Sequence, residues 1–343
     1  MLVNRTKKIF RACDPPSDSV SGLEFSPKTV PWIGLCAASW DHTVRIWKVE
    51  PSSEITTPKG LQKLTASPLD VSWNGEGNRI YACDSLGGVF QWDLQANHVS
   101  KVGSHASGVR ACHWLSTPNA SLLMTGSWDK TAKFWDLRTP SPVVSIDLPE
   151  RCYAADVSYP MAVVACAPQT IVTYCLTEGP VLANTTTLPG SPQQVRSVAI
   201  FHNSFGVPAG WAAVTTRGMM YVMKVQNQFV ADYALRCHVS EGGPIMDVYA
   251  VNDVRVHPTH QTLATGGSDG IYHFWDREKQ QKLYTSTTMD QPITKCAISA
   301  EGHMFAYALG YDWAKGHENV DPLKEPQICL RTCWNKMKPQ LLI

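Results

Sequence analysis

Short stretches in which apolar and polar residues alternate recur along the chain, each behind a turn and each ending in tryptophan. In the first clear case a turn at Asp41 precedes Val44 and Ile46, and the stretch ends at Trp47. A period of two places successive side chains on opposite faces of a β-strand, so one face of each strand is expected to be buried. An Asp with Thr, Lys or Gly beside it favours a tight turn between two strands. The pattern therefore predicts short antiparallel strands and an all-β fold.

This unit is repeated. Three segments align on their final tryptophan: Ser39–Trp47, Ser127–Trp135 and Gly267–Trp275. A fourth, Cys83–Trp92, keeps the ending but has Leu86 where the others have the turn Asp. The tryptophans at positions 47, 92 and 135 are 45 and 43 residues apart. That spacing is the length of one blade of a WD-type β-propeller.

Each repeat also needs polar anchors, because a buried tryptophan requires a partner for its indole N–H. The residues assigned to building the repeat are, in chain order, Asp41, Trp47, Trp92, His105, Ser127, Asp129, Trp135 and Asp269. In the third repeat we expect a hydrogen-bonded chain of four of these side chains: His105, Ser127, Asp129 and Trp135.

Weaker strand patterns fill the remaining positions of a seven-bladed ring. The 140 residues from Trp135 to Trp275 leave room for two further blades before the sixth. Residues 151–176 and 195–225 each contain three short apolar runs and are assigned to blades four and five. Strands of the seventh blade, interrupted by a long insertion, are expected at 293–298, 304–309 and 328–332.

With these strands, a ring of seven blades is still one outer strand short. The N-terminal segment 7–12 can supply it beside the last blade, which closes the ring and removes the free sheet edge. No helix-period pattern with caps is seen. We therefore predict an all-β, seven-bladed WD-repeat propeller closed by an N-terminal strand. It forms one domain over residues 1–343, with a C-terminal tail at 335–343.

Composition narrows the class of protein. The formal net charge is +1 and charged residues make up 17% of the chain, so no global field draws it to nucleic acid or to a membrane surface. The 11 cysteines include no C-x-x-C pair, and most stand among apolar residues, which favours a reducing compartment over a disulfide framework. No secretory signal and no apolar run of about 18 residues is seen. We expect a soluble, intracellular protein.

Candidates for chemistry are few. No phosphate-binding loop, G-x-S-x-G turn or H-E-x-x-H motif is present. Three pairs have suggestive spacing: His257 with His260, Cys329 with Cys333, and His317 with Glu318. The histidines fit a metal site or a structural loop at Pro258, and the cysteines fit core packing or, with two more ligands, zinc. The last pair fits a catalytic dyad or a stabilised turn. We expect no enzymatic activity, no metal and no cofactor.

Loops of a propeller gather on two faces around a central channel, and loops carry function. Trp40 and Trp128 stand directly before the turn Asp in two repeats. A tryptophan in a tight polar turn either contacts a bound peptide or lies flat on the next blade.

A basic cluster is the second candidate surface. It comprises Arg236, Arg277, Lys279 and Lys282, which we place at the rim between the fifth and sixth blades. Such a cluster is either a set of solvated turns or a patch for a phosphate backbone or an acidic peptide.

Five longer blocks are more specific than the generic repeat. They are 126–131; 149–157 with 159–165; 247–252 with 257–258; 263–265 with 267–270; and 305–308 with 311–318. In these blocks and their order the chain resembles the nuclear-pore-associated mRNA export factor family of WD-repeat proteins. A sister family, the mitotic checkpoint WD-repeat protein, shares the Ser-Trp-Asp-Lys-Thr turn at 127–131. The blocks Glu-Arg-Cys-Tyr at 150–153 and Tyr-Pro-Met-Ala-Val-Val at 159–164 favour the export factor.

The resemblance implies a non-enzymatic adaptor of the nucleus, nuclear envelope and nuclear pore that shuttles to the cytoplasm. It implies binding of a short acidic segment, the GLEBS motif, of the Gly-Leu-Phe-Gly nucleoporin, and links to mRNA export and spindle assembly. The residues implied in binding this segment are Trp40, Trp128, Arg151, Arg196 and Arg217. Those implied in contact with single-stranded RNA are Arg236, Trp275, Asp276, Arg277, Lys279 and Lys282. We expect a monomer within a heteromeric complex, without membrane insertion.

Departures from the family pattern bear on the implied RNA contact more than on the implied nucleoporin contact. Gln280 stands where the family tends to have a basic residue, and Met219 where an arginine is usual, with Arg217 two positions earlier. The alternatives are a mitotic checkpoint scaffold that binds GLEBS-like segments of checkpoint kinases, and an RNA-binding propeller that acts independently of the pore.

Overall fold

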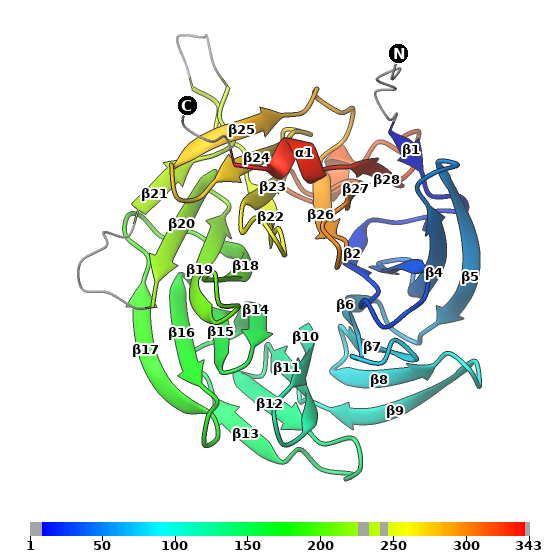
Figure 1. The fold of residues 1–343 in the computed structure, drawn as a ribbon, viewed down its shortest axis with the longest axis vertical. Helices are drawn as coiled ribbons and strands as arrows, with labels where there is room; N and C mark the ends of the chain where they lie inside the picture. Colours follow the sequence, from blue (N-terminus) through cyan, green and yellow to red (C-terminus); the bar gives the residue numbers. More distant parts are fainter. Residues whose placement is uncertain (1–8, 226–232, 241–245, 340–343) are drawn as a thin grey trace.

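The computed structural model describes residues 9–225, 233–240 and 246–339. They form seven four-stranded antiparallel sheets arranged like blades around a central axis (Figure 1). In six blades the four strands follow one another outward from the axis in chain order. The all-β, seven-bladed propeller expected from the repeats is confirmed.

The first three blades consist of β2 (Val20–Phe25), β3 (Ile33–Ser39), β4 (Thr43–Glu50) and β5 (Ile55–Lys63); β6 (Pro68–Trp73), β7 (Arg79–Asp84), β8 (Gly88–Asp93) and β9 (His98–Ser104); and β10 (Val109–Ser116), β11 (Ser121–Ser127), β12 (Thr131–Trp135) and β13 (Val144–Asp147). The next three consist of β14 (Cys152–Ser158), β15 (Met161–Cys166), β16 (Thr170–Cys175) and β17 (Val181–Thr187); β18 (Val195–His202), β19 (Pro208–Thr215), β20 (Met219–Lys224) and β21 (Tyr233–Arg236); and β22 (Val251–Val256), β23 (Leu263–Gly267), β24 (Tyr272–Asp276) and β25 (Gln281–Thr285). The seventh consists of β26 (Ile293–Ile298), β27 (Met304–Leu309), β28 (Gln327–Thr332) and β1 (Phe10–Arg11).

Strand β1 closes the ring as expected. It pairs antiparallel with β28, with Phe10 opposite Leu330, so the last blade takes its outer strand from the other end of the chain. The amide of Ala12 extends the pairing to the carbonyl of Ile328 at 2.8 Å. Residues 7 and 8 of the expected strand lie outside the described residues.

Side-chain carboxylates hold the turns between the second and third strands of blades one, two, three and six. Asp129 Oδ1 accepts the amide of Thr131 at 3.0 Å, and Asp41 plays the same part in the first blade. The second blade, which has Leu86 at this position, uses Asp84 instead. Its Oδ1 accepts the amides of Leu86 at 3.0 Å and Gly88 at 2.6 Å. The turn therefore keeps its capping carboxylate, supplied from the end of the preceding strand.

The polar chain of the third blade differs from the expected one in one member. His105 bonds to Asp129 through Nδ1 at 3.0 Å and to Thr125 Oγ1 through Nε2 at 2.8 Å, and Trp135 donates its indole N–H to the same hydroxyl at 2.8 Å. Thr125, not Ser127, thus connects the histidine to the tryptophan. Ser127 lies two residues closer to the loop on the same strand, and its hydroxyl oxygen accepts the amide of Asp129. Two Ser/Thr hydroxyls of one strand lie on the same face, and the sequence alone did not distinguish them.

Carboxylates on the innermost strands join neighbouring blades. One edge of each such strand faces the channel side, and its buried amides need acceptors. Asp156 Oδ2 accepts the amide of Ile200 in the next blade at 2.7 Å. Asp253 Oδ2 accepts that of Cys296 at 2.8 Å. These contacts, together with apolar clusters between facing sheets, hold neighbouring blades at a fixed spacing around the channel.

Two short helices were not expected. A 3-10 helix, η1 (His317–Asn319), lies in the blade-seven insertion, and α1 (Trp334–Met337) follows β28. Met337 is buried and its carbonyl accepts the Thr262 hydroxyl at 2.9 Å, so the start of the expected C-terminal tail packs on the sixth blade. Among the described residues, neither helix has the length and apolar content to cross a membrane.

Candidate functional site

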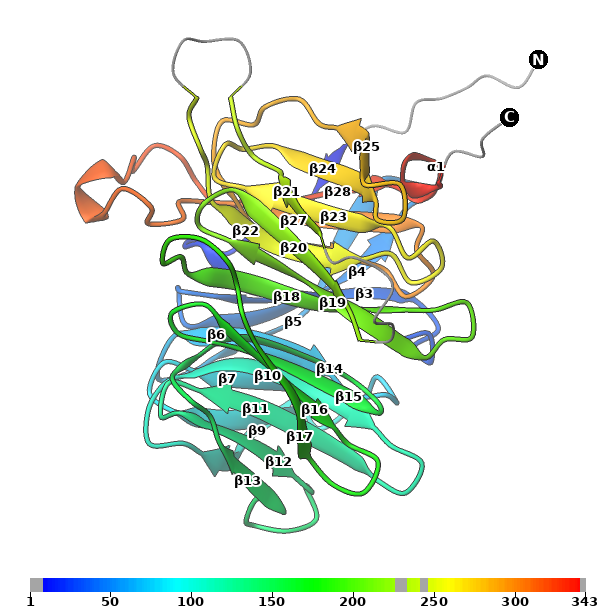
Figure 2. The same cartoon turned by 90° about the vertical axis from the view of Figure 1, so that its left-hand side faces the viewer.

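A cavity of about 660 Å³ opens at one mouth of the central channel. Turns between second and third strands contribute Trp40 and Trp128 to its wall. The blade-seven insertion, which projects from this face of the disc on the left of Figure 2, contributes Tyr311, Asp312 and Trp313. The site therefore combines loops from all around the ring.

One residue from each blade reaches this cavity through the same irregularity. The pairing of every innermost strand with its neighbour skips one residue near the start of the strand, which is a β-bulge. A bulge bends the strand and re-aims the extra side chain. The skipped residues, in blade order, are Ser21, Leu69, Arg110, Tyr153, Arg196, Asn252 and Thr294, and all line the cavity. We call them the bulge ring.

Three arginines from blades three to five form what we call the arginine side of the mouth. Arg110 and Arg196 belong to the bulge ring, and Arg151 lies in the loop before β14. In the part of the chain that the structure describes, none of the three forms an ion pair with a carboxylate. The buried Nε of Arg196 has no hydrogen-bond partner. Burial lowers the pKa of Arg196, an effect that the nearby Asp312 opposes.

The two turn tryptophans are placed for contact in different ways. The Trp40 side chain is 40% exposed. Trp128 is half-buried, and its ring lies against Gly108, where an added Cβ would come within 2.6 Å of the ring. Trp128 therefore packs on the start of its own blade and not flat on the next one, and its ring also lines the cavity. Contact of this tryptophan with a peptide stays a prediction.

Arg217 is separated from this group. It is exposed in the turn between β19 and β20, beside Gly218 with φ 70°, and it does not line the cavity. Arg110, Asp312 and Trp313 line the cavity but were not among the binding residues predicted from the sequence. Arg110 was detectable, because Val109-Arg110 and Val195-Arg196 open the innermost strands of their blades in the same way.

The residues assigned to RNA contact fall into two classes. Trp275 is 4% exposed and donates its indole N–H to Thr265 at 3.0 Å. Asp276 is buried and caps the following turn. Arg277 is buried with its guanidinium 3.9 Å from the centre of the Phe201 ring. These three side chains therefore belong to the packing and offer little surface to a ligand, and their assignment to RNA contact stays a prediction.

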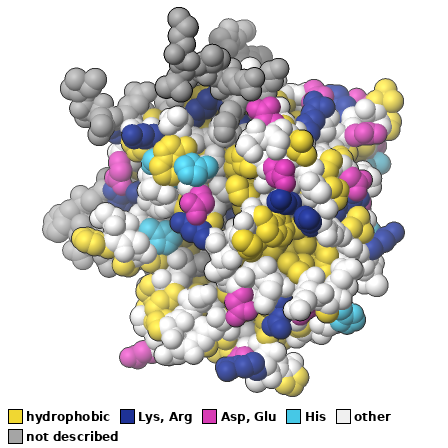
Figure 3. Space-filling view, turned by 45° about the vertical axis from the view of Figure 1, so that its right-hand side comes forward, with side chains coloured by type: hydrophobic (Ala, Val, Ile, Leu, Met, Phe, Trp, Pro, Cys, Tyr) yellow, Lys and Arg dark blue, Asp and Glu magenta, His cyan; other side chains and the backbone are white. Residues whose placement is uncertain are grey.

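Arg236, Lys279 and Lys282 are exposed. Arg236 pairs with Met219 at the turn between second and third strands, whereas Lys279 lies in the turn between third and fourth strands, toward the other face. The flank seen in Figure 3 has Lys and Arg side chains dispersed among Asp and Glu, in keeping with the small net charge.

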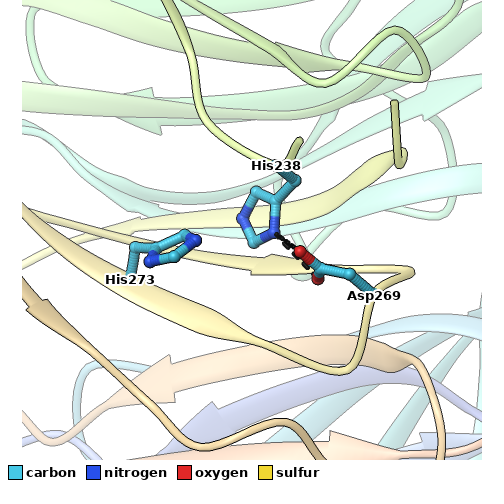
Figure 4. Close-up of side chains that lie close together, drawn as sticks. All are labelled: His238, Asp269 and His273. Carbon is cyan, nitrogen blue, oxygen red and sulfur yellow. Dashed lines mark hydrogen bonds and ion pairs between the residues drawn. The ribbon is translucent and has the colours of Figure 1, made fainter. Parts of the chain in front are cut away.

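His238, Asp269 and His273 lie close enough together to hold a metal ion (Figure 4). However, His238 already uses both ring nitrogens. Nδ1 bonds to Asp269 at 2.9 Å and Nε2 to Thr265 at 3.1 Å, and Thr265 in turn accepts the indole of Trp275. This is the polar chain of the third blade repeated in the sixth, so the group is a structural element of the repeat.

The His257 and His260 pair also has a structural role. His257 Nε2 bonds to the carbonyl of Gly302 at 2.9 Å, and its Nδ1 accepts the amide of His260 at 3.0 Å. Burial lowers the pKa of His257 to about 4, which agrees with a neutral ring. Both nitrogens are occupied within the fold.

Among the described residues, the other two candidate pairs have no third potential metal ligand close to them. Cys329 and Cys333 are buried free thiols, and the Cys333 thiol bonds to the Gly302 carbonyl at 3.2 Å. His317 and Glu318 are exposed in η1. The described residues contain no other close group of three potential metal ligands around these pairs.

Comparisons with known proteins agree with this architecture. The family model "WD domain, G-beta repeat" matches residues 7–48, 97–136 and 237–276. The chain is 44% identical to protein Rae1 of Drosophila melanogaster over 334 residues, which cover 97% of this chain and 96% of the relative. It is 42% identical to the mRNA export factor of Danio rerio and 41% identical to that of Xenopus tropicalis, in each case over 340 residues, 97% of this chain and 91% of the relative. With this identity over nearly its whole length, the chain belongs to the Rae1 and mRNA export factor family of WD-repeat proteins.

Proposed function

We propose that this chain is a non-enzymatic adaptor in mRNA export that binds an acidic, GLEBS-type segment of a Gly-Leu-Phe-Gly nucleoporin at the mouth of its channel. Its relatives in fish and frog are named mRNA export factors, which supports the export role. The nucleus, nuclear envelope and nuclear pore are the corresponding location, with the adaptor acting as a monomer within a heteromeric complex.

The observation that carries this proposal is the arginine side of the cavity. Arginines without acidic partners are suited to bind carboxylates through charge-assisted hydrogen bonds. Trp40, Trp128 and Trp313 line the same cavity, and tryptophan is enriched among residues that dominate binding energy. Cations beside exposed aromatic rings fit a segment that has both acidic and apolar residues.

Contact with single-stranded RNA is the second part of the proposal. It uses the exposed Arg236, Lys279 and Lys282 and is electrostatic, so its affinity falls as salt is raised. Because the buried Trp275, Asp276 and Arg277 offer little exposed surface, this contact is weaker and less specific than the nucleoporin contact.

Co-purification tests the first part directly. A tagged GLEBS-type segment retains the wild-type protein, and the double variant Trp128→Ala with Arg196→Glu is lost from the resin. Lys101→Glu, an equal charge reversal on the outer strand β9, is the matched control and stays bound. Full retention of the double variant on the resin would show that this cavity is not the binding site. Kinetochore staining without nuclear-rim staining would favour the checkpoint scaffold instead.

A further inference from the structure

The mouth of the channel is chemically two-sided. Blades three to five supply the arginine side. Next to it, over blades six and seven, the blade-seven insertion supplies a carboxylate, Asp312, followed directly by Trp313, which is 49% exposed. Both sides face one cavity, and Asp312 acts electrostatically on Arg196.

Asp312 is held in place by the neighbouring blade. Its Oδ2 accepts the side-chain amide of Asn252, the bulge-ring residue of blade six, at 3.0 Å and also the hydroxyl of Ser268. Its Oδ1 accepts the amide of Ala314 at 3.2 Å. The negative charge is therefore fixed at one side of the mouth.

One cation, Lys295, lies on the same side but does not cancel this charge. It is 7% exposed, and its Nζ lies 3.9 Å from Asp253 Oδ1 within the channel wall. Burial lowers the pKa of Lys295 to about 8, although Asp253 opposes the shift. With this pKa Lys295 remains largely protonated at neutral pH, but its ammonium group is directed toward Asp253 in the channel wall.

We propose that Asp312 determines specificity by excluding acidic groups from its side of the mouth. The bound segment is then bipartite: its carboxylates lie on the arginine side, and an uncharged aliphatic or aromatic residue lies against Trp313. This inference rests on the proposed function and refines it, because it states which part of the segment faces which blades.

Electrostatic repulsion explains how Asp312 distinguishes a uniformly acidic segment from a bipartite one. Two like charges about 5 Å apart in water repel by an amount that changes a binding constant about fourfold, the effect is larger where solvent is partly excluded, and salt screens it. A uniformly acidic segment meets this repulsion at Asp312, whereas a bipartite segment does not.

Two synthetic peptides of equal length provide the test. One has consecutive glutamates at one end and a leucine–phenylalanine pair at the other, and the second has glutamates throughout. Dissociation constants are measured by fluorescence anisotropy with the full chain. The wild-type protein prefers the bipartite peptide, and raising the ionic strength to about 1 M reduces the preference because the Debye length shrinks to about 3 Å.

Asp312→Asn removes the charge and keeps an oxygen that accepts from Asn252 and Ser268. We expect it to raise affinity for the uniformly acidic peptide about three- to tenfold and to change affinity for the bipartite peptide less than about twofold. Asp290→Asn is the matched control. It removes an exposed carboxylate that does not line the cavity, so the ratio of affinities stays as in the wild type.

An unchanged ratio in Asp312→Asn would overturn this inference. If Arg110→Glu still weakened binding of both peptides in that case, the proposed function would stand without it. If neither peptide bound the wild-type protein, the proposed function and the inference would both fail.

Discussion

Arg110 of blade three and Arg196 of blade five occupy the same structural position. Each is the extra residue of a β-bulge at the start of an innermost strand, and each side chain lines the cavity at the mouth of the channel. The bulge recurs in every blade, so the backbone offers seven equivalent positions around one opening. Under the proposed function, the blades that place arginine there bind acidic groups, while the rest of each strand maintains the sheet.

Replacing Arg196 by Met is expected to stabilise the free protein. The buried Nε has no hydrogen-bond partner and burial lowers the pKa of the guanidinium, so the charge is poorly compensated before a ligand arrives. We expect a gain of about 0.5–1 kcal/mol in the free energy of unfolding, together with weaker peptide binding. Urea unfolding measures the first effect. The exposed control Lys101→Met stays near the wild-type value, and a loss of stability in Arg196→Met would contradict this view of the site.

Asp253→Ala is expected to be strongly destabilising. The carboxylate is fully buried and accepts from the Ser197 hydroxyl at 2.7 Å and the Cys296 amide at 2.8 Å, with the Arg255 guanidinium at 3.1 Å. Burial alone would raise its pKa, but Arg255 and the other partners outweigh burial and the net shift is downward.

Removing one member of a buried charged network costs about 3–5 kcal/mol. Urea unfolding compares this variant with Asp147→Ala, an exposed carboxylate on β13 that is expected to change little. A cost below about 1 kcal/mol for Asp253→Ala would show that the inter-blade contacts matter less than their geometry suggests.

Stability is expected to fall on mild acidification. Burial lowers the pKa of His105 to about 4 from 6.5, although Asp129 pulls it upward, and burial lowers that of His257 to about 4 as well. The folded protein keeps these rings neutral, so below about pH 6.5 the unfolded chain binds more protons than the folded one. The contribution of these two histidines to the free energy of unfolding is therefore fully present above that pH and is lost as the pH falls toward 4.

Each ring contributes about 1–3 kcal/mol to this loss. The free energy of unfolding measured between about pH 7 and about pH 4.5 gives the slope directly. His98→Asn, at an exposed position on β9, leaves the slope unchanged, whereas His257→Asn reduces it. A wild-type profile that stays flat over this range would be inconsistent with neutral buried rings.

Arg277 and Arg236 are expected to respond differently to mutation. Arg277 stacks on Phe201 and pairs with Glu278 at 2.8 Å, so Arg277→Ala lowers the free energy of unfolding by about 1–3 kcal/mol. Arg236 is exposed, so Arg236→Glu leaves stability nearly unchanged and weakens binding of a single-stranded oligonucleotide. Thermal unfolding and filter binding at two salt concentrations separate the effects. Normal stability of Arg277→Ala with lost oligonucleotide affinity would restore Arg277 to the RNA surface.

The sequence predicted the architecture well because the repeat is local. Turn carboxylates, alternation over five residues and a closing tryptophan all lie within one hairpin, so Asp41 and Trp47 define a blade without knowledge of its neighbours. The weaker blades were found from apolar runs, and the seventh from the need to close the ring. In blade two Leu86 stands where the other repeats have the turn Asp, and Asp84 caps the turn instead. The sequence motif is lost there, although the turn is still capped by a carboxylate.

The binding site was less predictable because it depends on register and on contacts across the ring. A β-bulge is a mismatch between two strands, and nothing in β10 alone shows that Arg110 is the skipped residue. Asp312 enters the site through an insertion whose path depends on Asn252 of another blade. Burial of Trp275 and Arg277 likewise depends on blade five, so residues that appeared to form a surface cluster proved to be part of the packing.

The most direct test of the account is the affinity of the acidic peptide for the double variant Arg110→Glu with Arg196→Glu, measured by fluorescence anisotropy against the wild-type protein and against Lys101→Glu. If the bulge ring binds carboxylates, the double variant loses affinity by about 100-fold or more, while Lys101→Glu and the thermal stability of all three proteins stay close to wild type. An affinity within about threefold of wild type in a folded double variant would contradict the central claim that acidic segments bind at the mouth of the channel.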